Sequence, residues 1–151
     1  EGHDACRKIA ILTSLISGQH VDFEKIHTEG ITKISTEDFK YADALGVSIK
    51  LVGTTKKEGD TLYSFVAPMM LDENHPLSGI HDVFNGIFVH GNVVDDIMFY
   101  GRGAGKLPTA SAVVSDVVDE VKHIRILWQV GMQKHFQSVI SEMRLIVSSY
   151  G

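Results

Sequence analysis

The spacing of the apolar residues changes near Val47, and this change constrains the fold more than any other feature of the sequence. Before Val47, apolar residues recur at helical spacing over residues 4–17 and again over residues 35–46. After it, they alternate with polar residues, as in a strand with one buried face. A chain that begins with helices and continues with strands predicts an α+β domain.

Two turns divide the later part of the chain into hairpins. Gly59-Asp60 is a hairpin turn by composition, and so is Gly91-Asn92. Consecutive hairpins pair their strands in antiparallel fashion. We therefore expect a mostly antiparallel sheet of about four strands with helices on one face. The expected strands run from residue 47 to the first turn and over residues 61–71, 83–90 and 93–100.

The ends of the two expected helices carry capping residues. Asp4 is placed to cap the start of the first helix, and Gly18 is placed to end it. Ser35 and Asp38 have the spacing of a capping box at the start of the second. The residues expected on the buried stripes are Ala5, Ile9, Leu12 and Ile16 in the first helix and Phe39, Ala42 and Leu45 in the second.

Three further segments are assigned from shorter signals. Residues 30–34 could form a short strand, and Pro108 is placed to start a helix whose apolar stripe is rich in valine. Valine is a modest helix former, so this helix should depend on packing against another body. Residues 124–151 are treated as a C-terminal tail of unknown role, following a domain over residues 1–123. Within the tail, Phe136, Val139, Ile140, Met143 and Val147 fit one face of a helix.

Charge and composition argue against several classes of partner. The chain has 19 acidic and 14 basic residues and a formal net charge of -5, which disfavours binding to nucleic acid or to an anionic membrane. No apolar run approaches the roughly 20 residues of a membrane span. The eight histidines show no metal-ligand spacing, so we expect no metal site.

Three small groups of residues could carry chemistry. Residues 101–105 are rich in glycine but fit neither a P-loop nor a dinucleotide-binding fingerprint, so they are either a flexible turn or a backbone surface for a ligand. Asp4 and Lys8 share a helix face, as a surface ion pair or as a carboxylate and a proton donor facing a cleft. Cys6 is the one cysteine, and a packed side chain is its plainer interpretation.

Taken together, these motifs resemble the homoserine dehydrogenase family. Gly2-His3-Asp4-Ala5-Cys6-Arg7-Lys8 resembles the end of the family signature, Gly-x-Asp-x-x-x-Lys, which an apolar helix follows. Residues 99–105 (Phe-Tyr-Gly-Arg-Gly-Ala-Gly) and residues 107–114 resemble its most recognisable run. The shorter matches, in the family's order, are Glu29-Gly30-Ile31, residues 42–46, Ile49-Lys50-Leu51, His75-Pro76-Leu77 and Val83-Phe84-Asn85.

The resemblance implies a fold and an activity. The family interconverts homoserine and aspartate semialdehyde with NAD or NADP, in the cytoplasmic biosynthesis of threonine, methionine and isoleucine. Its substrate domain is similar to the second domain of glyceraldehyde-3-phosphate dehydrogenase, and its sheet supports a homodimer. The resemblance assigns the catalytic proton to Lys8, substrate binding to Asp4 and a cofactor contact to Gly105. The valine-rich helix would pack on a nucleotide-binding domain.

The resemblance also leaves parts of such an enzyme unaccounted for. The nucleotide-binding domain has no counterpart after Glu1, so we expect the chain to be part of something longer and to be inactive alone. One alternative is a binding or assembly module that kept the fold and lost the chemistry. Another is a semialdehyde dehydrogenase of related fold, which would need a catalytic cysteine, a role that Cys6 fits poorly beside Lys8.

Overall fold

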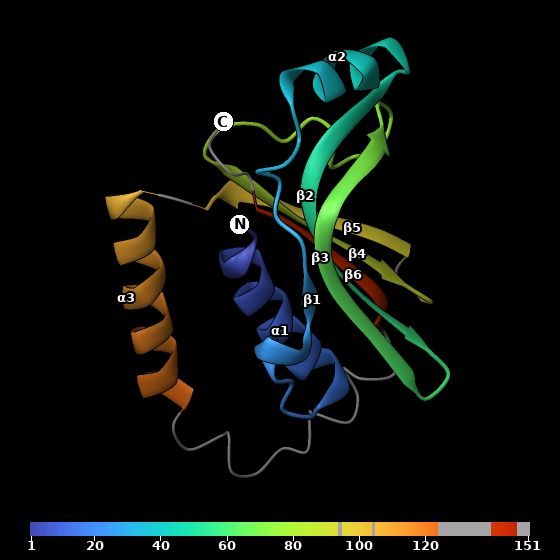
Figure 1. Cartoon of the computed structure of the whole chain (residues 1–151). Helices are drawn as coiled ribbons and strands as arrows, with labels where there is room; N and C mark the ends of the chain where they lie inside the picture. Colours follow the sequence, from blue (N-terminus) through green and yellow to red (C-terminus); the bar gives the residue numbers. More distant parts are fainter. Residues whose placement is uncertain (94, 104, 124–139, 148–151) are drawn as a thin grey trace.

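A six-stranded mixed sheet forms the centre of the described chain, and α1 lies across one of its faces (Figure 1). The computed structural model describes residues 1–93, 95–103, 105–123 and 140–147. The strand order is β1-β3-β2-β6-β4-β5. The elements are α1 (His3–Ser17), η1 (Phe23–Lys25), β1 (His27–Thr28), α2 (Thr36–Ala44), β2 (Val47–Glu58), β3 (Thr61–Asp72), β4 (Phe84–Gly91), β5 (Asp95–Arg102), α3 (Lys106–His123) and β6 (Ile140–Val147).

The expected α+β class is confirmed, and so is the pairing of both hairpins, but the second turn lies later than expected, because Gly91 ends β4 opposite Asp95 and β5 runs to Arg102. β2 and β3 are joined through Gly59 and Asp60, with Glu58 opposite Thr61. β4 pairs with β5 in antiparallel fashion from Phe84 to Gly91. The expected strand at residues 30–34 is wrong, because the short strand lies earlier, at β1, where it pairs in parallel with β3. The described sheet therefore has two strands more than the four expected, β1 and β6.

β6 occupies the middle of the sheet, between β2 and β4. It pairs in antiparallel fashion with β2 over Val52–Lys56 and with β4 over Asn85–Gly91. The expected helix is therefore wrong for Ile140, Met143 and Val147, while Phe136 and Val139 lie outside the described residues. Met143, Leu145 and Val147 also alternate at strand spacing, so the sequence of β6 does not by itself separate a strand from a helix.

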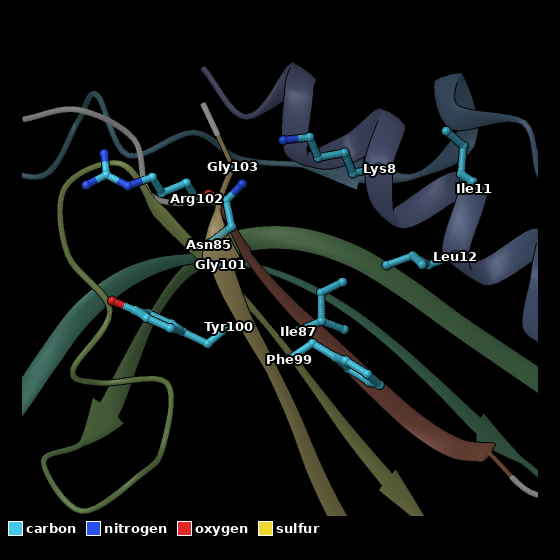
Figure 2. A pocket seen from close by; sticks show the side chains of 10 residues that line it. All are labelled: Lys8, Ile11, Leu12, Asn85, Ile87, Phe99, Tyr100, Gly101, Arg102 and Gly103. Carbon is cyan, nitrogen blue, oxygen red and sulfur yellow. The ribbon is translucent and has the colours of Figure 1, made fainter. Parts of the chain in front are cut away.

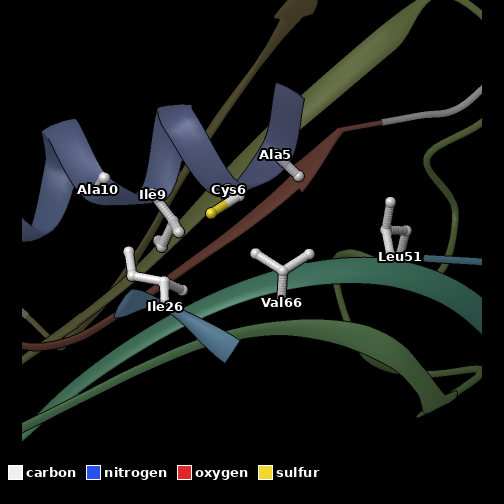
Figure 3. Close-up of a cluster of buried hydrophobic side chains, with 7 residues drawn as sticks. All are labelled: Ala5, Cys6, Ile9, Ala10, Ile26, Leu51 and Val66. Carbon is white, nitrogen blue, oxygen red and sulfur yellow. The ribbon is translucent and has the colours of Figure 1, made fainter. Parts of the chain in front are cut away.

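α1 is fixed to the sheet by a close-packed apolar face (Figure 3). Ile9 is fully buried, and a Cβ added to Gly53 of β2 would lie 3.2 Å from the Ile9 Cβ. The buried Thr13 hydroxyl donates to the Ile9 carbonyl at 2.6 Å and lies 3.1 Å from the Ser64 hydroxyl of β3. Because this buried hydroxyl has its partners, the helix docks without an unpaired polar group.

The helix ends agree with the sequence in part. Asp38 and Ser35 form the expected capping box, and Gly18 ends α1 in a left-handed conformation. The expected cap at Asp4 is wrong, because Gly2 takes the cap position without a side-chain hydrogen bond. In α2, Leu45 is 72% exposed, and Ala42 is the buried residue of the expected stripe.

β2 is buried on both faces, where alternation predicted one buried face. Leu51 packs in the cluster under α1. Val52 points the opposite way and packs with Leu77 and Ile80, from the segment between β3 and β4. This segment, residues 73–83, therefore covers the face of the sheet that α1 leaves open.

His75 lies in this covering segment and couples its packing to pH. Its ring stands 5.2 Å from the Phe88 ring, and its Nδ1 accepts a hydrogen bond from the Leu77 amide at 3.1 Å. Burial lowers the pKa of His75 from its ordinary 6.5, and the positive charge of Arg144 on β6 lowers it further. Asp96 and Asp72 oppose this shift in the pKa. The folded chain therefore holds His75 in its neutral form.

We expect the free energy of unfolding to fall as the pH drops below about 6.5, because the unfolded chain then binds a proton that folded His75 resists. The loss continues until the pH reaches the lowered pKa of the folded state. His75→Asn keeps an acceptor for the Leu77 amide but cannot be protonated, so its pH dependence should be shallower. Urea unfolding of both proteins between about pH 5 and 8 measures the difference. Equal slopes would contradict this prediction.

α3 is exposed along its length within the described part of the chain. Its expected stripe includes Val113, Val117 and Val121, and each is more than half exposed. In Figure 1 the helix stands away from the sheet. The stripe is therefore not buried by the described residues, which agrees with the prediction that this helix depends on packing against another body.

Candidate functional site

The local fold at the start of α1 places Asp4 and Lys8 together. Gly2 has a φ of 87°, and a Cβ there would lie 3.0 Å from the Thr28 side chain, so a glycine is required where the helix begins. One turn apart, the Lys8 Nζ and the Asp4 Oδ2 lie 2.9 Å from each other. The side chains are 37% and 69% exposed, respectively, so the pair lies at the surface rather than in the core.

Lys8 borders an open pocket of about 550 Å³ between α1 and the β4–β5 end of the sheet (Figure 2). The walls are mainly apolar, from Leu12 of α1, Ile87 of β4 and Phe99 of β5. An ammonium group at the border of such a pocket can stabilise a negative charge that develops on a bound ligand. The lining residues are Lys8, Ile11, Leu12, Asn85, Ile87, Phe99, Tyr100, Gly101, Arg102 and Gly103.

The first three residues of the glycine-rich run, residues 101–103, line this pocket. Gly101 and Gly103 line it, and the Gly103 amide donates to the Val83 carbonyl at 3.0 Å. Gly105 is not among the lining residues. It has a φ of 127°, a conformation that favours glycine, and its position precedes α3. Within the described residues, the structure thus brings Lys8 together with residues 101–103 and leaves Gly105 outside the pocket.

Asn85 was missed as a site residue by sequence reasoning. It is the opposite neighbour of Gly101 in the β4–β5 pairing, and it lines the pocket with Lys8. Its place in the Val83-Phe84-Asn85 motif was visible in the sequence, but its partner was not, because the pairing of the strands decides which residues meet.

Cys6 faces away from the Lys8 pocket. Its thiol is buried and donates to the Phe23 carbonyl at 3.3 Å, at a separate hollow that Arg7 and Phe23 also line. A catalytic cysteine would have to share a pocket with the other reacting groups. This placement argues against the alternative of a cysteine-dependent semialdehyde dehydrogenase.

The described residues contain no group of three or more histidine, cysteine, aspartate or glutamate side chains that could hold a metal ion. Among them, the helices lack the length and apolar character needed to cross a membrane.

Comparison with known proteins assigns the chain to a family. Residues 1–118 match the family model described as homoserine dehydrogenase. The homoserine dehydrogenase of Bacillus subtilis is 43% identical over 126 residues, covering 83% of this chain and 29% of that protein. That of Mycobacterium bovis is 36% identical, covering 99% of this chain and 35% of that protein. The chain therefore belongs to the homoserine dehydrogenase family.

Solved structures agree with this assignment. A homoserine dehydrogenase from Thiobacillus denitrificans superposes with a TM-score of 0.78 at 37% identity, over 82% of this chain and 28% of that one. The S. aureus homoserine dehydrogenase at pH 7.5 gives a TM-score of 0.73 at 39% identity, covering 82% and 31% of the two chains. The chain thus spans about a third or less of the length of these relatives.

Proposed function

We propose that this chain is the substrate-binding and catalytic domain of a homoserine dehydrogenase, which interconverts L-homoserine and L-aspartate 4-semialdehyde with NAD or NADP. The observation that carries the proposal is Lys8 at the border of the apolar pocket, with the Asp4 carboxylate, which is not among the lining residues, 2.9 Å from its Nζ. The pair lies within the segment that matches the family model, and the resemblance of residues 2–8 to the family signature supports its assignment as that signature's aspartate and lysine. The two residues would divide the work between proton transfer and substrate binding.

Lys8 would serve as the proton donor in the reduction. As hydride adds to the aldehyde carbon, negative charge develops on the aldehyde oxygen, and an ammonium group can stabilise that charge and then protonate it. In the reverse direction the same amine accepts the hydroxyl proton of homoserine. Lys8 is partly exposed, but its neighbours Ile9 and Thr13 are buried against the sheet and fix the part of α1 that carries it, which supports this role.

Asp4 would bind the polar end of the substrate and hold Lys8. Its carboxylate is 69% exposed, so it can accept hydrogen bonds from a ligand as well as from Lys8. It also lies in the first turn of α1, where the helix dipole favours a negative charge. The amino group of homoserine is the complementary partner for such a carboxylate.

The nicotinamide cofactor, when bound, supplies or accepts the hydride. Ile87 and Phe99 form an apolar wall, and Gly101 and Gly103 present backbone without side chains, which fits a flat ring. Gly105 would contact the cofactor at the turn before α3. A nucleotide-binding domain would cover the exposed valines of α3, and a homodimer would form through the sheet.

An assay of homoserine oxidation tests the proposed function. The complete reading frame that encodes this chain should form NADH or NADPH when homoserine is added, and should not do so with serine, which lacks one methylene group. The 151-residue chain alone should show no turnover, because it spans about a third or less of the length of its relatives. Inactivity of a folded complete protein would favour a binding or assembly module instead.

A further inference from the structure

We propose that Asn85 is a positioning residue of this site. Its carboxamide fills the space beside Gly103 and so sets the position of the glycine-rich turn next to Lys8, meaning residues 101–103 where β5 ends. The inference rests on the proposed function, because it concerns the same pocket. Asn85 itself need not touch the reacting atoms. Its effect would pass through the backbone of residues 101–103, which forms one wall of the pocket.

Strand pairing puts the Asn85 side chain on the pocket face of the sheet. Asn85 stands opposite Gly101, two residues from the pair formed by Ile87 and Phe99. Because side chains alternate along a strand, Asn85 points to the same face as Ile87, which is the face with the pocket. Figure 2 shows its amide beside Gly103, with Lys8 on the helix above.

On the opposite face of the sheet, the end of β5 is held by aromatic contacts with β4. Phe84 pairs with Arg102, whose guanidinium lies 5.2 Å from the centre of the Phe84 ring. Phe84 also stacks on Tyr100, with ring centres 4.8 Å apart and nearly parallel planes. The turn is therefore packed on one face by Phe84, and Asn85 supplies the packing on the other.

The tightest restriction on space at Gly103 comes from the Asn85 side chain. A Cβ built on Gly103 would overlap the Nδ2 and Cγ atoms of Asn85, and the three nearest heavy atoms all belong to that side chain. Gly103 does not have the positive φ that would itself favour glycine. A Cβ on Gly101 would meet nothing within 4 Å. Glycine at position 103 is thus explained by the amide beside it.

This arrangement predicts that the two positions are coupled. Gly103→Ala would push the turn away from the sheet, or push the Asn85 amide out of its place. Either movement changes the wall of the pocket beside Lys8, where a displacement of about 1 Å can cost roughly 100-fold in rate. Asn85→Ala leaves a gap instead, so the turn loses its support. In the double variant the added methyl group enters the space that the amide has vacated.

The test is a double-mutant cycle in the complete reading frame, with Asn85→Ala, Gly103→Ala and the double variant. We expect Gly103→Ala to lower kcat/KM for homoserine by about 100-fold, mainly through kcat with little change in KM, at a temperature where the protein stays folded, and Asn85→Ala by less. The double variant should recover most of the loss caused by Gly103→Ala. Gly79→Ala is the matched control, because a Cβ there meets nothing within 4 Å in an exposed loop.

The outcomes separate this inference from the proposed function. Additive effects of the two substitutions, or a double variant worse than Gly103→Ala, would overturn the pairing. A fully active Gly103→Ala variant would overturn it as well. The same four proteins are also compared by their thermal unfolding midpoints, a measurement that does not require enzymatic activity. If the changes in unfolding midpoint are not additive, but the protein never oxidises homoserine, the proposed function is rejected and the contact between Asn85 and Gly103 is retained. If the changes in midpoint are additive, the inference is rejected.

Discussion

Replacement of Lys8 by alanine in the complete reading frame is expected to lower kcat for homoserine oxidation by about 100- to 10,000-fold, the range for loss of a general acid–base group. The variant removes the amine that accepts the hydroxyl proton and leaves the apolar walls of the pocket in place. The KM for homoserine should change much less, because Asp4 would still bind the polar end of the substrate. Steady-state rates of NAD(P)H formation measure both constants.

A lysine elsewhere on the surface provides the matched control. Lys25 ends η1, its side chain is 83% exposed, and it lies outside the Lys8 pocket. Lys25→Ala removes the same charge and should keep the activity of the parent protein. If Lys8→Ala retained more than about half of the parent's kcat, the proton-transfer role would be wrong, since half the rate corresponds to only about 0.4 kcal/mol of barrier.

Removal of residues 124–151 is expected to abolish cooperative folding of the chain. The deletion takes out β6, which provides the only strand pairing between the β1-β3-β2 part of the described sheet and the β4-β5 part. Every ladder hydrogen bond that β6 makes with β2 and β4 would be lost. A domain is stable by only about 5–15 kcal/mol, so the loss of a central strand should exceed this margin. Circular dichroism during heating would show no sharp unfolding transition.

A single substitution tests the same strand without shortening the chain. Ile146 lies between Val52 of β2 and Gly86 of β4. Ile146→Pro removes a backbone N–H from a central strand and should destabilise the sheet strongly. Ile146→Val keeps that N–H and a β-branched side chain, so it is the control. An unchanged unfolding midpoint after the deletion would mean that residues 124–151 are an appendage.

Local signals allowed much of the fold to be predicted from the sequence. The capping box of Ser35 and Asp38 depends on residues three positions apart, and the Gly59-Asp60 turn depends on adjacent ones. The spacing of Asp4 and Lys8 likewise predicted a shared helix face, which the 2.9 Å contact confirms. Each of these features is decided by neighbours in the sequence, so the sequence is sufficient for it.

Features that depend on distant segments could not be predicted. β6 was assigned to a helix because its apolar spacing fits both periods, and its two neighbours lie far away in the sequence. The second buried face of β2 depends on Leu77 and Ile80 folding back over the sheet. The contact between Asn85 and Gly103 depends on the register of β4 with β5. The sequence motifs indicated which regions form the site. Only the pairing of the strands and the packing of the side chains show which residues come into contact.

Transfer of a deuterium label shows whether the complete protein moves a hydride between NAD(P)H and aspartate 4-semialdehyde. The complete protein would be incubated with aspartate 4-semialdehyde and NAD(P)H that carries deuterium at C4 of the nicotinamide on either face, and the product would be analysed by mass spectrometry and NMR. Our account predicts homoserine with one deuterium on C4, the former aldehyde carbon, from one of the two labelled cofactors and not from the other. It also predicts that Lys8→Ala forms this product far more slowly. Aspartate semialdehyde recovered unchanged, from a folded protein given both labelled cofactors, would contradict it.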